Sequence, residues 1–281
     1  MLNTYNAYFK RIKNKYDPVF NQVLDAMIDA GIKQYEEFGT VGVLPIEELT
    51  KALTELHLDA GVRWANYTRK SIEKKSIKAY EVKAVGDNYI AYIREYLNRN
   101  LMNKSVIPIE KTEREIMLRV IANGIENGDN PNKIASNLRE LKLGTARARL
   151  IVRTETGRAM NTGAMFAAAE SNVVVNKIWN SAQNNRTRRI PRDENDHLRM
   201  NGVKVAYYEW FFVPGMKGID LMQYPCDPAG SAGNVCNCRC AVSFEPTNER
   251  RDVLARNEFI DIIEFVRNSV TLNIVNMQEN E

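Results

Sequence analysis

The spacing of apolar residues changes once along this 281-residue chain, and that change constrains the fold more than any other feature. Up to about residue 171, apolar side chains recur every three or four positions, as they do from Tyr16 to Ile28, which is typical of amphipathic helices. Beyond that point apolar and polar residues alternate, which predicts strands over Val173–Trp179, Val203–Val213 and Cys236–Phe244. A series of helices followed by a few strands indicates an α+β fold.

Punctuating residues divide the helical part. Gly31 and Gly39 interrupt the first long helix, and Pro45 is expected in the first turn of the next. Another helix is predicted around Tyr80–Leu101, and Asn103–Pro108 is expected to break the chain. Pro131 is expected at the first position of a short helix before a long one of small residues, Thr145–Ser171.

The chain is longer than a usual single domain of about 100–200 residues, so we expect two domains. We predict a helical domain over 1–144, which could serve as a docking arm, and a compact α+β domain over 145–247. In the second domain a long central helix accompanies a small antiparallel sheet. Residues 248–281 are predicted to form a C-terminal helix and tail.

Composition excludes several classes of protein. With 44% hydrophobic and 26% charged residues, the chain is a soluble globular type, and it has no apolar run of about 18 residues that would span a membrane. Its start lacks the apolar core of a secretory signal. A disulfide-stapled secreted protein would be smaller and would spread its cysteines across the fold, whereas here all four are clustered, so we expect folding in a reducing cytoplasm. A net charge of +4 permits contact with nucleic acid without demanding it.

The four cysteines lie within fifteen residues, at Cys226, Cys236, Cys238 and Cys240. On a strand, the last three would share one face with Val242, which favours core packing. Residues four apart on a strand lie about 13 Å apart, too far for Cys236 and Cys240 to share one zinc. One adjacent pair, joined by Cys226 and His197, could still bind zinc, and a redox pair is a further alternative. We expect no cofactor, with zinc as the alternative.

An arginine-rich loop lies between the first two predicted strands. Its arginines could contact the phosphates of DNA, or pair with the interleaved acids and order the loop. The candidate DNA contacts are Arg186, Arg188, Arg189 and Arg192. His197, near Asp196, could act as a general base or metal ligand, but an ordering role is favoured because no second histidine or recognised nucleophile lies nearby.

Charged residues on the small-residue helix form another group. Arg149, Arg153, Glu155 and Arg158 favour buried salt bridges over an active-site pair. His57, on the N-terminal helices, is expected to be structural. No catalytic residue is assigned.

The order of these elements resembles the Mu F-like family of phage head morphogenesis proteins. The resemblance covers about 100 residues, from Arg147 to Cys240. The signature residues are Arg153, Glu155, Asn161, Trp179, Arg186, Arg188, His197, Gly202, Tyr224, Pro225, Asp227, Pro228, Asn237, Cys238, Arg239 and Cys240. The chain departs from the usual pattern at Met200-Asn201, where leucine-aspartate is common, and at Cys226, where glycine is common.

The resemblance implies a minor capsid protein of a tailed bacteriophage, a structural rather than an enzymatic component of the virion. Such a protein would be assembled in the host cytoplasm, near the portal vertex in the capsid interior, and would assist head assembly or genome packaging and ejection. The implied partners are the portal protein, the major capsid protein and packaged DNA, with no membrane. The alternative is a nucleic-acid-directed enzyme or a DNA-binding protein carried in the virion, using the Arg186–Arg199 loop and His197.

Overall fold

The computed structural model describes residues 1–76, 97–98, 100–143, 145–171, 173–216 and 218–250, together with residues 90 and 94. Its contacts divide the chain into two compact units. The described residues of the helical unit fall in Asn3–Val62 and Asp87–Ala159, and those of the strand unit in Met1–Leu2, Arg63–Gly86 and Met160–Glu281. Two of the boundaries, after Val62 and after Ala159, fall inside α2 (Glu47–Lys75) and α6 (Thr145–Ala169), so each of these helices contributes residues to both units.

The helical unit begins with α1 (Leu2–Phe38), which is longer than the sequence predicts. Gly31 does not interrupt it. A Cβ at Gly31 would lie 2.5 Å from the Met117 Cε of α4, so the glycine permits close packing of two helices and does not end one. The helix ends just before Gly39, whose φ of +73° is favourable for glycine.

The predicted break at Asn103–Pro108 is wrong. A π-helical turn, η1 (Met102–Val106), leads directly into α4 (Ile107–Glu126), with Pro108 in the first turn of α4. Proline has no N–H to donate, and a first-turn residue needs none, so the helix accommodates it there. The helix predicted around Tyr80–Leu101 lies mostly outside the described residues, as does the predicted C-terminal helix and tail beyond Arg250.

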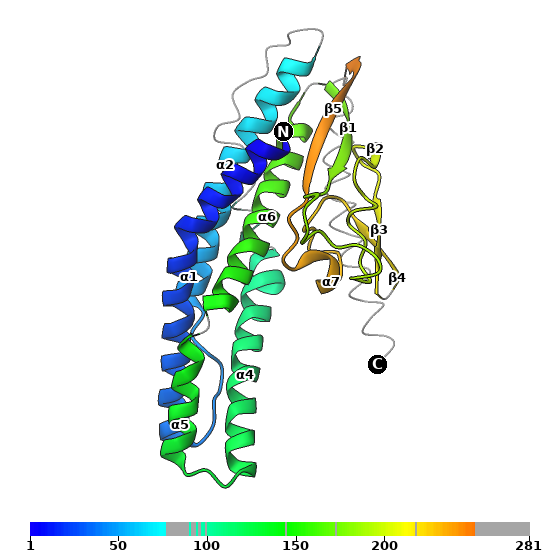
Figure 1. Cartoon of the computed structure of the whole chain (residues 1–281). Coiled ribbons are helices and arrows are strands. Elements are labelled where there is room, and N and C mark those ends of the chain that lie inside the picture. The colour runs from blue at the N-terminus through cyan, green and yellow to red at the C-terminus, as the bar shows by residue number, and fades with distance from the viewer. Residues whose placement is uncertain are drawn as a thin grey trace, which may run out of the picture. The chain divides into compact units, whose positions relative to one another are not determined.

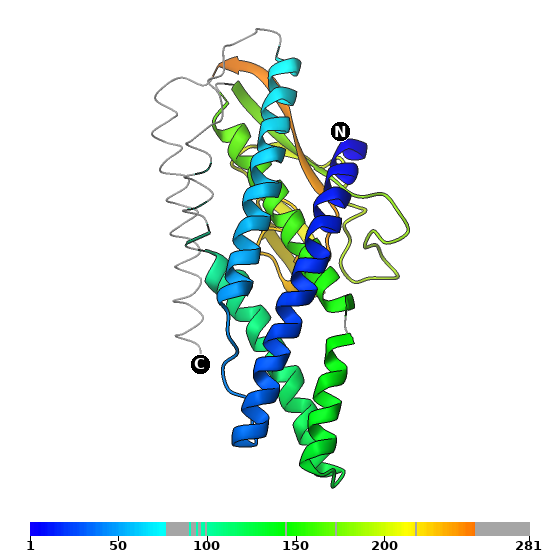
Figure 2. The ribbon, with the colours of Figure 1, turned by 90° about the vertical axis from the view of Figure 1, so that its left-hand side faces the viewer.

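Helices α4 and α5 (Pro131–Glu140) form a hairpin that Figure 1 shows at the end of the helical unit. Pro131 begins α5 as predicted, and the Asn130 side chain caps it by accepting a hydrogen bond from the Lys133 N–H at 2.9 Å. Figure 2 shows the same hairpin from the side. Ion pairs join its second arm to α1: Arg139 with Glu36 at 2.6 Å, and Lys142, in the 3₁₀ turn η2 (Leu141–Leu143), with Asp29.

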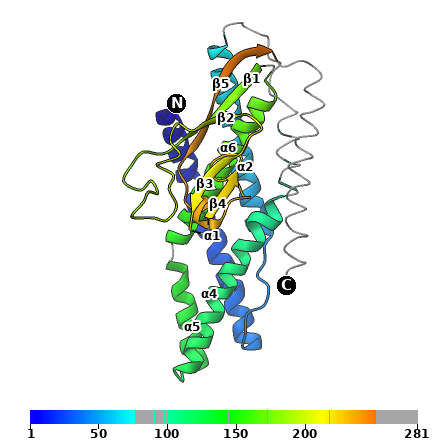
Figure 3. The same cartoon turned by 90° about the vertical axis from the view of Figure 1, so that its right-hand side faces the viewer.

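The strand unit contains two small antiparallel sheets (Figure 3). In the first, β1 (Val173–Asn180) lies between β2 (Lys204–Ala206) and β5 (Ala241–Arg250). In the second, β3 (Phe211–Gly215) pairs with β4 (Gly218–Met222). This arrangement is the α+β fold predicted from the sequence.

Two strand predictions are wrong. The single strand expected over Val203–Val213 is two strands in different sheets, because the chain turns between Tyr207 and Trp210. The strand expected from Cys236 begins only at Ala241. Before it lie the short helix α7 (Ala232–Val235) and a bend at Asn237, whose φ is +61°.

Between the sheets lies a buried cluster that includes three of the four cysteines. Its members are Trp179, Met200, Phe211, Val213, Met222, Cys226, Val235, Cys238 and Cys240. The predicted core location therefore holds for Cys238 and Cys240, although not on a strand, whereas Cys236 is only half-buried. Cys226, for which the sequence predicted no core position, is buried as well. In the described part of the chain, no helix has the length and apolar character needed to cross a bilayer.

Candidate functional site

Asn161 connects three parts of the strand unit from its position on α6. Its amide group donates to the carbonyl oxygens of Pro225, at 2.9 Å, and Cys240, at 3.2 Å. Its Oδ1 accepts a hydrogen bond from the Val242 N–H at 2.9 Å. One fully buried side chain therefore satisfies three backbone groups and fixes where β5 starts.

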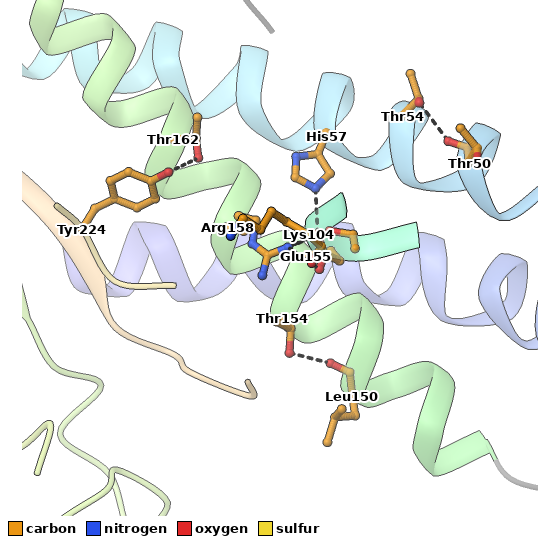
Figure 4. Close-up of polar contacts among 11 residues, drawn as sticks. Thr50, Thr54, His57, Lys104, Leu150, Thr154, Glu155, Arg158, Thr162 and Tyr224 are labelled. Atoms are coloured by element: carbon orange, nitrogen blue, oxygen red, sulfur yellow. Dashed lines mark hydrogen bonds and ion pairs between the residues drawn. The ribbon is translucent and has the colours of Figure 1, made fainter. Parts of the chain in front are cut away.

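The Tyr224–Pro228 segment is held by its own turn and by α6. The Thr162 hydroxyl donates to the Tyr224 hydroxyl at 3.2 Å (Figure 4). The Asp227 carboxylate accepts hydrogen bonds from the N–H groups of Gln223, at 2.7 Å, and Ala229, at 3.0 Å. Asp227 thus stabilises a turn.

His197, Cys238 and Cys240 converge in the buried cluster. The Nδ1 atom of His197 lies 3.5 Å from the Sγ of Cys238 and 3.6 Å from the Sγ of Cys240. The three atoms all lie within 4.8 Å of one another, and each of the three residues is at most 2% exposed. The positive φ at Asn237 makes this convergence possible, because it turns the chain before Cys238.

The thiols of this group do not titrate alike. Hydrogen bonds from the Cys226 and Cys240 thiols, aided by His197, hold the pKa of Cys238 well below its usual value. The pKa of Cys240 lies well above its usual value because its thiol donates to Cys238 and is buried. The Cys240 N–H also points to the Cys238 sulfur at 3.5 Å, so Cys238 is the preferred thiolate.

Three further side chains fix the orientation of the histidine ring. The Nε2 atom of His197 lies 3.0 Å from the Oδ1 of Asn234, whose amide nitrogen donates to Asp220 at 2.7 Å. Asp220 also accepts from the N–H of Ser231 at 2.8 Å. Because the Asn234 amide donates to Asp220, its oxygen must accept from His197, which places a proton on Nε2; in the neutral ring Nδ1 is then the acceptor.

The arginine-rich loop is partly self-ordered. Arg188 donates to the carbonyl of Cys236 and lies 3.7 Å from Asp193, and Arg192 donates to backbone carbonyls within the loop. Arg186, Arg189 and Arg192 are exposed, and of these Arg192 is held by its contacts within the loop. Both readings of the loop thus apply to different arginines: two order the loop, and two project from it.

A second buried polar group lies in the helical unit (Figure 4). The Glu155 carboxylate lies 2.9 Å from the His57 Nε2 and 2.9 Å from the Arg158 Nη1, and accepts from the Ser105 hydroxyl at 3.1 Å. Burial raises the pKa of Glu155, but Arg158 and His57 outweigh it and hold the pKa below its usual value. This is the predicted buried salt bridge, with His57 as an unforeseen partner.

The remaining signature residues have structural positions. Trp179 is buried, and its carbonyl accepts from the N–H of Gly202, where φ is +80°. Half-buried positions are occupied by Arg153, Pro228, Asn237 and Arg239. Together with the contacts above, most of the signature residues serve to lock the strand unit.

Sequence reasoning missed Lys177, which lies fully buried on the inward face of β1 and donates to the Gln223 side chain. Burial lowers the pKa of Lys177 to about 7, although Asp227 and Glu209 oppose the change. Its position in the alternating pattern of Val173–Trp179 already marks it as inward-facing. It also missed Asn234 and Asp220, whose roles depend on the tertiary fold and carry no local signal.

Comparison with known proteins agrees with the signature. The sequence model of the family described as "Phage Mu protein F like protein" matches residues 115–243. Residues 115–243 of this chain thus resemble the Mu F-like family. It is also 27% identical over 272 residues to minor head protein GP7 of Bacillus phage SPP1, across 83% of this chain and 81% of that protein. No solved structure matches the chain significantly. Both matches are to bacteriophage proteins, and the relative is a minor head protein.

Proposed function

We propose that this Mu F-like protein is a minor head protein that joins the phage capsid at the portal vertex during assembly and assists genome packaging or ejection. The observation that carries the proposal is the similarity to minor head protein GP7, which extends over 83% of the chain and is not confined to the signature region. The similarity therefore includes helical segments as well as strands. The portal protein is the preferred partner, and the major capsid protein is the second.

A structural role is favoured over an enzymatic one by the burial of the polar side chains. His197, the residue considered as a general base, is 1% exposed and has both ring nitrogens engaged. Glu155 and Arg158 are 4% and 6% exposed and pair with each other. A catalytic group must reach the reacting atoms of its substrate, and a nucleic acid cannot reach these side chains.

Co-purification with the portal protein tests the assembly role. We expect the tagged protein to be retained with procapsids isolated from infected cells, and to co-elute with portal protein when only the two are expressed together. Retention on procapsids that lack portal would assign the docking site to the major capsid protein. Failure to associate with either would contradict the proposal.

DNA contact is the finer part of the proposal, and it rests on Arg186 and Arg189 because these side chains are exposed. Each lost phosphate contact reduces the slope of the logarithm of the binding constant against the logarithm of the salt concentration by about 1. Removing two arginines should therefore reduce that slope by about 2. We therefore expect R186A/R189A to weaken binding to duplex DNA at low salt and to flatten its salt dependence. The matched control is R192A, since Arg192 donates within its own loop. Equal salt slopes for wild type and R186A/R189A would exclude this surface.

A further inference from the structure

We propose that His197, Cys226, Cys238 and Cys240 form a closed site for a structural zinc ion. These residues come from three separate stretches of the strand unit: the arginine-rich loop, the Tyr224–Pro228 segment and the turn before β5. A metal ion held by them would cross-link those stretches at the centre of the buried cluster. The proposal is independent of any portal or DNA role.

The spacing of the donor atoms fits a tetrahedral ion. With zinc–nitrogen bonds of about 2.0 Å and zinc–sulfur bonds of about 2.3 Å, tetrahedral geometry places a nitrogen and a sulfur ligand roughly 3.6 Å apart. The Nδ1 of His197 lies 3.5 Å and 3.6 Å from the sulfurs of Cys238 and Cys240. The objection that cysteines on one strand are too far apart does not apply, because Cys238 and Cys240 are not on a strand.

The protonation of the ring fits as well. A metal-ligating histidine almost always donates its other N–H to an oxygen acceptor, which fixes its tautomer. The contacts of His197 with Asn234 and of Asn234 with Asp220 do this here. They leave Nδ1 directed at the sulfurs of Cys238 and Cys240.

Cys226 supplies the fourth donor in this proposal. Its sulfur is not among the three ligand atoms that already lie within 4.8 Å of one another, so metal binding would move its side chain toward them. It is fully buried, and its sulfur lies 3.9 Å from the carbonyl oxygen of Cys238. Its φ is +68°, a left-handed conformation that is strained for a non-glycine residue and persists where the surroundings require it. A thiol that completes a metal site gives a reason for a cysteine at a position where glycine would be unstrained.

The chemistry of the four donor atoms indicates which metal the site would bind and whether that metal would be structural or catalytic. Thiolate and imidazole ligands favour zinc over calcium, magnesium or manganese, which prefer oxygen. Three cysteines and one histidine are a common structural zinc set, whereas catalytic zinc sites keep one position open to water. All four residues are at most 2% exposed, which leaves no route for substrate.

Elemental analysis of the full-length protein tests the site. After expression in zinc-supplemented medium and purification without chelators, we expect about one zinc per chain, and loss of most of it in C238S and C240S. The matched control is C236S, because Cys236 is half-buried and lies outside the convergent group. Less than about 0.2 zinc per wild-type chain would overturn the proposal, as would equal loss in C236S.

Cobalt substitution decides the question even where a cysteine variant fails to fold, because it uses the wild-type chain. Tetrahedral thiolate coordination gives Co²⁺ intense visible bands and a sulfur-to-metal charge-transfer band in the near ultraviolet. We expect both, with charge-transfer intensity reduced in C226G by the share of one thiolate in three. Octahedral, weakly absorbing cobalt would refute the site, and so would a Cys238–Cys240 disulfide in the freshly purified protein.

Asn234 is a positioning residue in this proposal. Loss of an outer-shell partner typically weakens metal binding by about 10–100-fold. We expect N234L to weaken zinc affinity, measured by competition with a chromogenic chelator, by a factor in that range. S231A, which removes a hydroxyl that contacts Asp220 but not His197, is the control and should leave the affinity within about threefold of wild type. Unchanged affinity in N234L would remove Asn234 from the site.

Discussion

The buried ionisable side chains of the two units have different kinds of partner. In the helical unit, Glu155 is surrounded by Arg158, His57 and Ser105, so the charges compensate one another. In the strand unit, Lys177 has an amide oxygen as its partner, and burial lowers its pKa to about 7. His197 faces sulfur atoms there instead of a carboxylate. The Glu155 cluster is thus balanced by its own charges, whereas burial pushes Lys177 toward its neutral form.

The largest expected effect is on how the free energy of unfolding depends on pH in wild type and in K177M. The unfolded chain binds the Lys177 proton more tightly than the folded protein, so wild-type stability should rise relative to K177M between about pH 7 and 10.5. At about 1.4 kcal/mol per pKa unit, a lowering from 10.5 to about 7 corresponds to roughly 5 kcal/mol across that range. Urea unfolding at several pH values measures it. Parallel stability curves would show that Lys177 stays charged.

The next largest effect is expected in the helical unit. E155L leaves Arg158 buried without its carboxylate, which should cost about 3–5 kcal/mol in the free energy of unfolding. Removing both charges in E155L/R158M should restore much of that loss, since a well-packed apolar pair can replace a buried ion pair. Thermal and urea unfolding provide the measurement. If the double variant were no more stable than E155L, compensation would not explain this cluster.

Asn161 offers a smaller effect within the strand unit. N161A leaves the carbonyls of Pro225 and Cys240 and the N–H of Val242 without this side chain, and we expect a loss of about 2–4 kcal/mol. The neighbouring T162A removes one hydrogen bond to Tyr224 and should cost only about 1 kcal/mol. Equal losses would mean that Asn161 acts through packing alone.

The smallest effect is expected at the arginine loop. R186A/R189A removes two exposed side chains, so stability should stay within about 0.5 kcal/mol of wild type while DNA binding weakens. The same samples used for the salt titration can be unfolded in urea. A large stability loss would place these arginines in the internal network of the loop.

Local pattern was sufficient to predict α6, β1 and the start of α5, because apolar spacing and a capped proline reflect interactions between near neighbours in sequence. Local pattern gave the wrong element at the cysteines. Alternation predicted a strand through Cys236–Cys240, but the left-handed conformation of Asn237 bends the chain and brings Cys238 toward a histidine 41 residues away. Asparagine adopts the left-handed conformation more readily than most residues, but its presence in a sequence does not show that it does so at a given position. Lys177 could have been found from its inward position on β1, whereas the contacts of Asn234 exist only in the folded chain.

The arginine loop is anchored at several points before any partner arrives. Gly202 donates to the Trp179 carbonyl at its base, Leu198 donates to the carbonyl of Arg188, and Arg188 reaches Cys236. Ordering a mobile segment on binding costs about 0.5–1.5 kcal/mol for each rotamer-rich side chain that is immobilised, besides the backbone. Here these hydrogen bonds order much of the loop backbone during folding, so binding need not order it again. Any anion that meets Arg186 and Arg189 therefore encounters a preorganised surface, and its affinity depends mainly on charge and ionic strength rather than on induced fit.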